Sequence, residues 1–388
     1  MSAESRAELV RGERPFPVIS TAILGVLMVI GVVVAIIRYI NGLGAVTNLS
    51  DGRAWGLWIS FDLYCGVALA SGGFTLAAAV YIFRLRKYYP IVRSAILTAF
   101  LGYLMVIAAL LVDLGLPWRI WYLTIYWNPH SPLFEVGWCV LLYTIVLALE
   151  FSPNVFERFN MQAPLRLIRS IQIPLVVAGI VLSTLHQSSL GSVLLLMPDK
   201  IHPLWFTPIL PILFFLSAVA VGLAMVIVEA SLGSRALGHQ VDLDILAGLG
   251  GALPYILGLY LVVKLGDLLL AGGLGLIFSS GIYSVLFLAE IIGGVIVPLI
   301  LFALPAVRRS RRALFWSAVL VVLGLVLNRL NASWFAVAPR PGTNYVPHPM
   351  EFAISIAIVS AGILGYLLAT RYFPVVQHGP SVGESATT

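Results

Sequence analysis

The sequence predicts an all-α polytopic membrane protein with ten transmembrane helices. Of its 388 residues, 60% are hydrophobic and only 10% are charged, whereas a soluble domain is roughly 45–50% apolar and about 25% charged. Apolar runs long enough to cross the hydrocarbon core of a bilayer recur along the chain. The segments between them do not alternate polar and apolar residues as the strands of a membrane barrel would. Helices that face lipid can be apolar on every side, which accounts for this composition.

Ten apolar runs mark the predicted spans when windows of about 19 residues are compared. The first follows three arginines but is too long for the core of a signal peptide and lacks an A-x-A cleavage site, so we expect an uncleaved first span. The chain is then divided into an N-terminal tail at 1–16, a membrane domain at 17–370 and a C-terminal tail at 371–388. In chain order the runs are 17–40, 55–83, 91–113, 134–151, 167–187, 206–232, 246–270, 279–304, 313–331 and 350–370.

Lys and Arg residues distinguish the two ends of these spans. The two tails and the connections at 84–93, 152–169, 233–245 and 305–312 hold 16 of them, against 4 in the other set of connections. Because cytoplasmic loops carry the excess of Lys and Arg, both termini are predicted to be cytoplasmic. The outward connections are longer and mix aromatic, polar, Gly and Pro residues, and we expect function on that side.

Aromatic and histidine side chains in the outward connections predict a docking surface for a partner protein. A single tryptophan there can simply anchor a helix at the lipid headgroups. Their concentration on one side favours docking for the group as a whole. The predicted docking residues are Trp118, Trp121, His202, Trp205 and His348.

Polar side chains at bilayer depth predict a binding pocket. Each ionisable group there costs about 2.5–3.5 kcal/mol on insertion scales and requires a reason. Asp62 shares a helix face with Trp55 and Trp58, and His186 lies toward the outer end of the fifth span. Six helices carry such groups at one depth, which indicates an amphipathic pocket for the oxygens of a quinone head group. The predicted quinone-binding residues are Trp58, Asp62, His186, Gln187, Ser188, Lys264, Asp267 and Arg329.

Some of these polar residues also have a purely structural interpretation. Lys264 and Asp267, spaced i,i+3, can form an ion pair that satisfies itself. Asn328 and Asn331 can hydrogen-bond between helices. Both interpretations stay open beside the quinone pocket.

Three carboxylates predict a proton pathway. Glu290 lies in the eighth span, where a carboxyl group either bridges helices or relays protons. Glu150 and Glu229 lie at the cytoplasmic ends of the fourth and sixth spans, where water can also reach them. Protons entering through Glu150 or Glu229 and passing to Glu290 would make quinone turnover move charge across the membrane.

The sequence offers no donor set for a metal or nucleotide cofactor. Cys65 and Cys139 stand alone in apolar runs, without the spacing of a metal or iron-sulfur site. A bis-histidine haem needs two facing histidines, and only His186 lies in a predicted helix. No phosphate-binding glycine motif occurs, and the basic residues form no single face for nucleic acid.

Several segments resemble the NrfD/polysulfide-reductase membrane-subunit superfamily. The likeness covers nearly the whole chain. Within the superfamily, the chain is similar to the ten-helix branch that contains the hydrogenase b-type membrane subunit and the Dsr complex membrane subunit. Glu229, Asp267 and Glu290 also agree, although isolated acids are less specific than the motifs. The matching segments are 51–62 (DGRAWGLWISFD), 148–153 (ALEFSP), 185–192 (LHQSSLGS) and 200–205 (KIHPLW).

The resemblance implies two four-helix bundles, spans 2–5 and spans 6–9, flanked by helices 1 and 10. It also implies a subunit without haem or cluster that binds menaquinone near the outer face of a bacterial or archaeal plasma membrane. A ferredoxin-like iron-sulfur subunit on the periplasmic side would exchange electrons with it, together with further subunits of hydrogenase, multihaem cytochrome c or Dsr type.

Two other classes of function remain as alternatives. The chain could be a membrane anchor for redox subunits without quinone chemistry of its own. It could also be a secondary transporter, although transporters usually form their sites from broken helices at the midplane of two repeats. Here the polar groups crowd toward one face instead.

Overall fold

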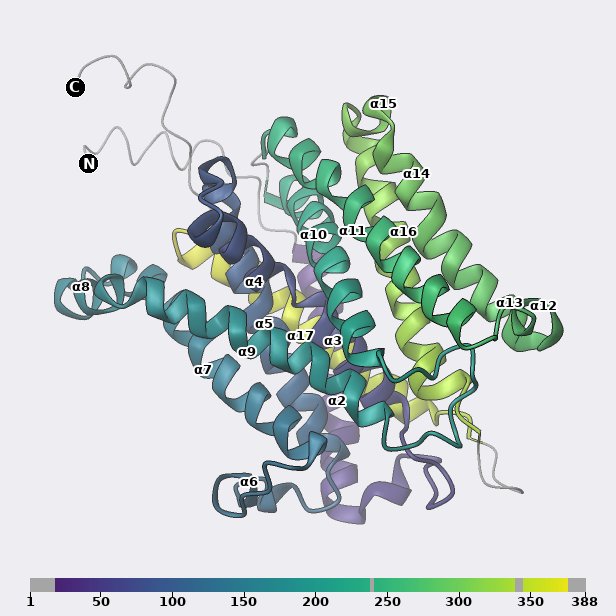
Figure 1. Ribbon diagram of the computed structural model, residues 1–388. Coiled ribbons are helices and arrows are strands. Elements are labelled where there is room, and N and C mark those ends of the chain that lie inside the picture. Colours follow the sequence, from purple (N-terminus) through teal and green to yellow (C-terminus); the bar gives the residue numbers. More distant parts are fainter. Residues whose placement is uncertain (1–17, 238–240, 339–344, 376–388) are drawn as a thin grey trace.

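The fold is a set of long helices that pack side by side (Figure 1). The structure is a computed structural model that describes residues 18–237, 241–338 and 345–375. Within these residues ten helices are long and apolar enough to cross a membrane, which confirms the predicted all-α membrane fold. The predicted tails at 1–16 and beyond 375 lie outside the described residues.

Seven of the spans are single helices, six of them among the first seven spans. Each is apolar and exceeds the roughly 20 residues that a bilayer requires. They are α2 (Val18–Asn41), α5 (Tyr89–Asp113), α7 (Pro132–Arg158), α9 (Gln172–Leu194), α10 (Leu210–Leu237) and α11 (Leu243–Leu270). The tenth span, α17 (Pro349–Tyr372), is also a single helix.

The other three spans contain wider π-helical turns. The second span joins η2 (Trp58–Leu63), α3 (Tyr64–Leu69), α4 (Gly72–Ala77) and η3 (Ala78–Ile82). The eighth joins α13 (Ile282–Leu288), η6 (Ala289–Ile296) and α14 (Val297–Ala303). The ninth joins α16 (Arg311–Leu330) and η7 (Asn331–Phe335). The π-helical turns contain Asp62, Glu290 and Asn331, and such turns often occur at functional positions.

Short helices lie in the connections. They are η1 (Leu43–Ala45), η4 (Arg86–Tyr88), η5 (Pro117–Arg119), α6 (Tyr122–Ile125), α8 (Gln162–Ser170), α12 (Leu276–Ser279) and α15 (Pro305–Arg308). The sequence did not predict α8 as a separate helix. It occupies residues that were assigned to a connection and to the start of the fifth span, so that span begins and ends later than predicted.

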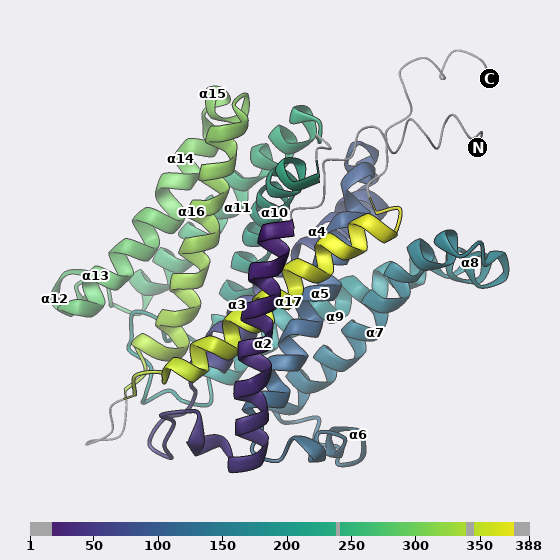
Figure 2. The same ribbon diagram turned by 180° about the vertical axis from the view of Figure 1, so that it is seen from behind.

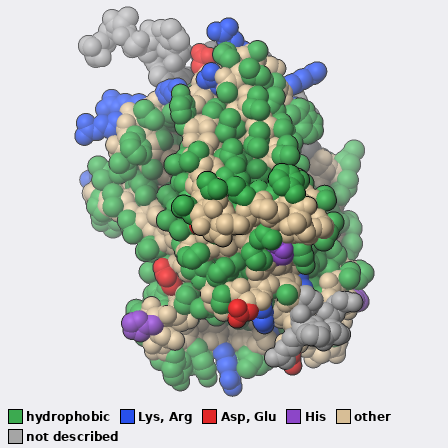
Figure 3. Space-filling model, turned by 45° about the vertical axis from the view of Figure 1, so that its right-hand side comes forward, with side chains coloured by type: hydrophobic (Ala, Val, Ile, Leu, Met, Phe, Trp, Pro, Cys, Tyr) green, Lys and Arg blue, Asp and Glu red, His purple; other side chains and the backbone are tan. Residues whose placement is uncertain are grey.

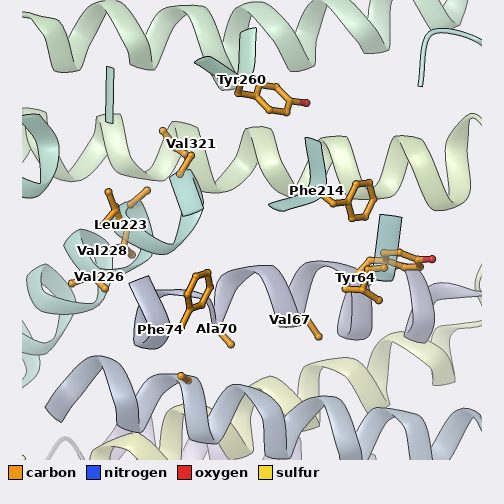
Figure 4. Packing of buried hydrophobic residues seen from close by; sticks show 14 of the residues in the cluster. Tyr64, Val67, Ala70, Phe74, Phe214, Leu223, Val226, Val228, Tyr260 and Val321 are labelled. Carbon is orange, nitrogen blue, oxygen red and sulfur yellow. The ribbon is translucent and has the colours of Figure 1, made fainter. Parts of the chain in front are cut away.

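The spans form two four-helix bundles with two flanking helices, as predicted. In the first bundle α7 packs against α9 and α5, and in the second α10 packs against α11 and α16. The bundles meet where α10 contacts α9 and the second span. Figure 4 shows Tyr64 of the second span on the side of Phe214 of α10, whereas Val67 points to the opposite side, and all three belong to one buried cluster. Figure 2 shows the first and tenth spans, α2 and α17, crossing each other on the outside of α5.

The two ends of the bundles differ in chemistry. We call the end with the connections at 84–88, 158–171 and 304–310 the basic side, and the end with the connections at 42–57, 114–131 and 195–209 the aromatic side. Figure 1 shows α15 on the basic side and α6 at the opposite end. In Figure 3 apolar side chains cover the middle of the visible face, and most of the visible Lys and Arg side chains lie toward the end that carries α15.

The backbones of the eighth and ninth spans touch at two glycines. A Cβ added to Gly294 of η6 or to Gly324 of α16 would collide with the Cα of the other residue. This contact allows the two segments to approach closely just beside Glu290. Any larger residue at either position must force the helices apart.

Replacing Gly324 with Ala is therefore expected to destabilise the protein. We expect Gly324→Ala to lower the free energy of unfolding by about 1–3 kcal/mol, as overpacking typically does, measured by thermal unfolding in mild detergent. The matched control is Gly293→Ala, because a Cβ at Gly293 meets nothing within 4 Å. Equal stability of the two variants would contradict the close contact.

Candidate functional site

The Glu290 carboxyl is the centre of a buried network in the second bundle. Trp205 Nε1 and Asn331 Nδ2 each donate to Glu290 Oε2 at 2.8 Å, and Asn328 Nδ2 donates to Oε1 at 2.8 Å. All four side chains are buried. Both carboxyl oxygens therefore have partners. A cavity of about 30 Å³ beside Glu290 and Tyr260 has room for water.

Two buried cations extend this Glu290 network. Arg329 Nη1 donates to Asn328 Oδ1 at 2.7 Å, and its guanidinium lies 3.6 Å from the centre of the Phe214 ring. Lys264 Nζ donates to the Leu204 carbonyl oxygen at 2.8 Å. The hydrogen-bond partner of Lys264 is thus a main-chain carbonyl. No ion pair joins it to Asp267 among the described residues.

The Glu290 network also holds the connection at 195–209 against the second bundle. Trp205 and Leu204, which contact Glu290 and Lys264, both belong to this connection. In the middle of this connection His202 N donates to the Ala336 carbonyl oxygen at 2.9 Å. The buried carboxyl and ammonium groups therefore fix the position of a loop on the aromatic side.

A second polar group surrounds His186 inside the first bundle. The Tyr103 hydroxyl lies 2.8 Å from His186 Nδ1, and the rings of Tyr103 and Tyr143 are 4.7 Å apart between centres. Gln187 Nε2 donates to the Val67 carbonyl oxygen at 2.9 Å. His186 Nε2 and Gln187 Oε1 are buried and have no hydrogen-bond partner in the protein. Buried polar atoms of this kind usually indicate a ligand or water.

A third polar group lies between the second and tenth spans. The Ser355 hydroxyl of α17 donates to Asp62 Oδ2 at 2.6 Å, and both residues are buried. The Trp58 indole nitrogen donates to the Glu351 carbonyl oxygen at 3.1 Å. The Glu351 carboxyl accepts from Asn48 N and His348 N and organises the start of α17. This Asp62 group faces α17, whereas the His186 group faces the interior of the first bundle.

The predicted quinone-binding residues are therefore distributed over three groups. His186 and Gln187 lie together, with partly buried Ser188 beside them; Asp62 and Trp58 lie together; and Lys264 and Arg329 belong to the second bundle. Asp267 is partly buried near the aromatic end of α11. The sequence placed all of these groups at one depth, but the packing of the helices separates them.

The predicted proton-pathway residues also lie apart. Glu150 lines a cavity of about 330 Å³ on the basic side, together with Arg93, Glu157 and Gln172. Glu157 there forms salt bridges with Arg93 and Arg169. Glu229 is buried where α10 meets α5 and α17, and it accepts a hydrogen bond from Ser94. Glu290 lies nearer the aromatic side, because a connection on that side reaches it.

The predicted docking residues differ in exposure. Trp118 and Trp121 are 64% and 52% exposed on the aromatic side. Trp205 is buried in the Glu290 network, and His348 caps α17 by accepting from Met350 N. His202 stacks on Tyr283, and burial lowers the pKa of its imidazole. Of these five predicted residues, only Trp118 and Trp121 present broad surface to a partner.

The described histidines do not fit a bis-histidine haem. His186 alone lies inside a described span, and one ring nitrogen is engaged by Tyr103. His130 and His202 lie in connections on the aromatic side, and His348 caps α17. His202 and His348 accept from main-chain nitrogens, and His239 and His378 lie outside the described residues. No group of three or more His, Cys, Asp or Glu in the described chain could hold a metal ion.

Four side chains of these groups were not predicted from the sequence. Tyr103, Tyr143 and Ser183 line the His186 group, and Ser355 binds Asp62. Tyrosine and serine residues are common within apolar spans, so their presence alone does not predict a functional site. Only the helix face that they share with an ionisable partner could have identified them.

Replacing Glu290 with Gln is expected to destabilise the second bundle. An amide has one accepting oxygen in place of two, so at least one of the three donors loses its partner. We expect a loss of about 1–3 kcal/mol, measured as the change in unfolding temperature in detergent. Asp199→Asn, in an exposed connection, is the control and should be neutral; a neutral Glu290→Gln would contradict the role of the network.

Comparison with known proteins adds a family and several relatives. Residues 45–332 match the family described as Polysulphide reductase, NrfD. A protein of Nitratidesulfovibrio vulgaris is 38% identical over 376 residues, covering 94% of this chain and 96% of the relative. The probable Ni/Fe-hydrogenase 2 b-type cytochrome subunit of Escherichia coli is 35% identical over 360 residues, 91% of each chain. The menaquinone reductase integral membrane subunit of N. vulgaris is 31% identical over 363 residues, 86% of each.

Proposed function

Because this chain belongs to the NrfD family of polysulphide reductase membrane proteins, we propose that it exchanges electrons between an iron-sulfur partner and menaquinone in the bilayer. The relatives named above include membrane subunits of a hydrogenase and of a menaquinone reductase. The partner would dock on the aromatic side, where Trp118 and Trp121 are exposed. We further propose that this side is periplasmic and that both termini are cytoplasmic, in the plasma membrane of a bacterium or archaeon, because the opposite side is basic.

The observation that carries this proposal is the pair of unpartnered buried atoms on neighbouring residues of α9. Reduction of a quinone to a quinol takes up two electrons and two protons, so its oxygens require both donors and acceptors. His186 Nε2 and Gln187 Oε1 provide one of each when the Tyr103 hydroxyl donates to Nδ1. On the α17 side of the second span, Asp62 and Ser355 would provide a second position for a quinone ring.

The second bundle has a different part in this proposal. Lys264, Arg329 and Glu290 have protein partners, and these contacts hold the 195–209 connection in place. We propose that this network holds the connections of the aromatic side in the arrangement that the partner subunit binds. Asp267 would act through its charge at the edge of the second bundle, and Ser188 would act through its size at the edge of the first.

Protons would reach His186 from the basic side through the first bundle. The Glu150 carboxyl and the Tyr143 ring both lie against Gly179 of α9. Tyr143 packs on Tyr103, which contacts His186. This series connects the 330 Å³ cavity of the basic side with the unpartnered Nε2. Glu229 would serve a parallel entry, and Glu290, with both oxygens occupied, would not be the next step after Glu150.

Purification in mild detergent tests the class of function. We expect cluster-bearing subunits and extractable menaquinone to co-purify, without the absorbance of a haem bound to this chain. We also expect His186→Ala to assemble normally and to lose quinone reduction by about 10²–10⁴-fold, the range for a missing proton-transfer group. An assembled His186→Ala complex with full activity would instead indicate an anchor without quinone chemistry.

Removal of the Tyr143 hydroxyl tests the proton route. We expect Tyr143→Phe to slow quinone reduction and proton uptake in proteoliposomes on the order of tenfold, because bridging water can replace the hydroxyl only partly. The control is Tyr255→Phe, since Tyr255 is 81% exposed on the outside of α11. Unchanged proton uptake in Tyr143→Phe would eliminate this route.

A further inference from the structure

An apolar cavity outside the two bundles has not been assigned a role above. It has a volume of about 350 Å³ and lies between the first, third and tenth spans, α2, α5 and α17. None of its lining residues is polar. Five of the smallest are Gly31, Ala35, Ala108, Ala357 and Ala361.

The cavity runs along the spans from their middle toward the aromatic side. Gly362 and Leu101 lie near the centres of α17 and α5, whereas Val112 and Ile354 lie within a turn or so of the aromatic ends of these helices. Val34, Val112 and Ile354 belong to a buried cluster that also contains Trp58. Trp58 therefore packs in the same cluster as the residues at the aromatic-side end of the cavity.

The Asp62 group begins where the cavity ends. Ser355, which donates to Asp62, follows Ile354 directly in α17. Asp113 follows Val112 in α5, and Arg38 Nε donates to the Val112 carbonyl oxygen at 2.7 Å. Acidic, basic and hydroxyl groups thus stand at one end of an elongated apolar cavity.

We propose that this cavity binds the isoprenoid chain of a quinone whose ring occupies the second position, at Asp62 and Ser355, rather than the position at His186. This inference rests on the proposed function and adds the subsite that holds the chain. An elongated apolar cavity that ends at polar groups matches a molecule with a polar ring and a long methyl-branched tail. The small residues provide width for the branches, and burial of the tail supplies affinity through the hydrophobic effect.

The entrance suits a ligand that arrives from the bilayer. Val32 of α2 and Leu104 of α5 line the cavity and are 56% and 41% exposed. At this depth the surroundings of the protein are lipid chains, so an apolar tail can enter sideways without crossing water.

Filling the cavity tests the proposal with the assembled complex. Ala108→Phe and Ala361→Phe each place a ring in the cavity. Val29→Phe adds the same ring at a position of α2 that is 64% exposed. The substrates are a menaquinone with an isoprenoid chain and the same ring without a chain. We expect the two cavity variants to raise KM for the long-chain quinone about tenfold and to leave KM for the chainless ring unchanged, with Val29→Phe like the wild type.

Other outcomes would overturn the proposal in distinguishable ways. Equal effects on both substrates, or no effect on either, would exclude a tail site. Loss of a tightly bound phospholipid from Ala108→Phe without dependence on quinone chain length would assign the cavity to a lipid acyl chain. Inactivity of the wild-type complex toward both quinones would overturn the proposed function itself.

A labelling experiment provides a readout that does not depend on activity. A quinone with a photoreactive isoprenoid chain is expected to label peptides of α2, α5 and α17 in the wild type, and to label them less in Ala108→Phe. Labelling confined to other helices would contradict the assignment. Thermal unfolding of each variant shows whether it is folded before either measurement.

Discussion

The buried carboxyl group of Glu290 is the constraint on which the second bundle depends. A carboxyl inside a bilayer is tolerated only when its oxygens find partners, and here the donors come from a connection, from α16 and from η7. The 195–209 connection, the eighth span with Glu290 and the ninth span with both asparagines must therefore meet at one point. The close approach of Gly294 and Gly324 beside it allows the helices to bring the donors near enough.

The ionisable groups of the two bundles differ in how far they are hydrogen-bonded, although Arg329 Nε and Asn331 Oδ1 of the second bundle also lack partners among the described residues. In the second bundle both oxygens of Glu290 are occupied, and Lys264 has a main-chain partner. In the first bundle His186 Nε2 and Gln187 Oε1 have none. Occupied groups fix structure, whereas unoccupied ones are available to a substrate. This difference explains why similar residue types at similar depths are given different parts in the proposed function.

The sequence predicted the spans well because length and hydropathy alone determine them. The fifth span was displaced, since the polar run at 186–192 resembles the end of a helix, yet its side chains face the inside of the bundle. The grouping of the candidate site could not be predicted. Hydropathy gives the depth of Asp62, His186 and Lys264 in the membrane, but it does not say which helix faces pack against each other. The partners Ser355 of Asp62 and Tyr103 of His186 are therefore seen only in the packed structure.

The wider turns in three spans restrict how these segments can change length. A π-helical turn holds one residue more than an α-helical turn, and an α-helix rotates by about 100° per residue. Deleting one residue from η2 or η6 would restore a regular helix but would swing everything beyond it around the axis, turning Asp62 or Glu290 away from its partners. Insertions and deletions should therefore accumulate in the connections, while these three spans keep a fixed count of residues across long evolutionary divergence.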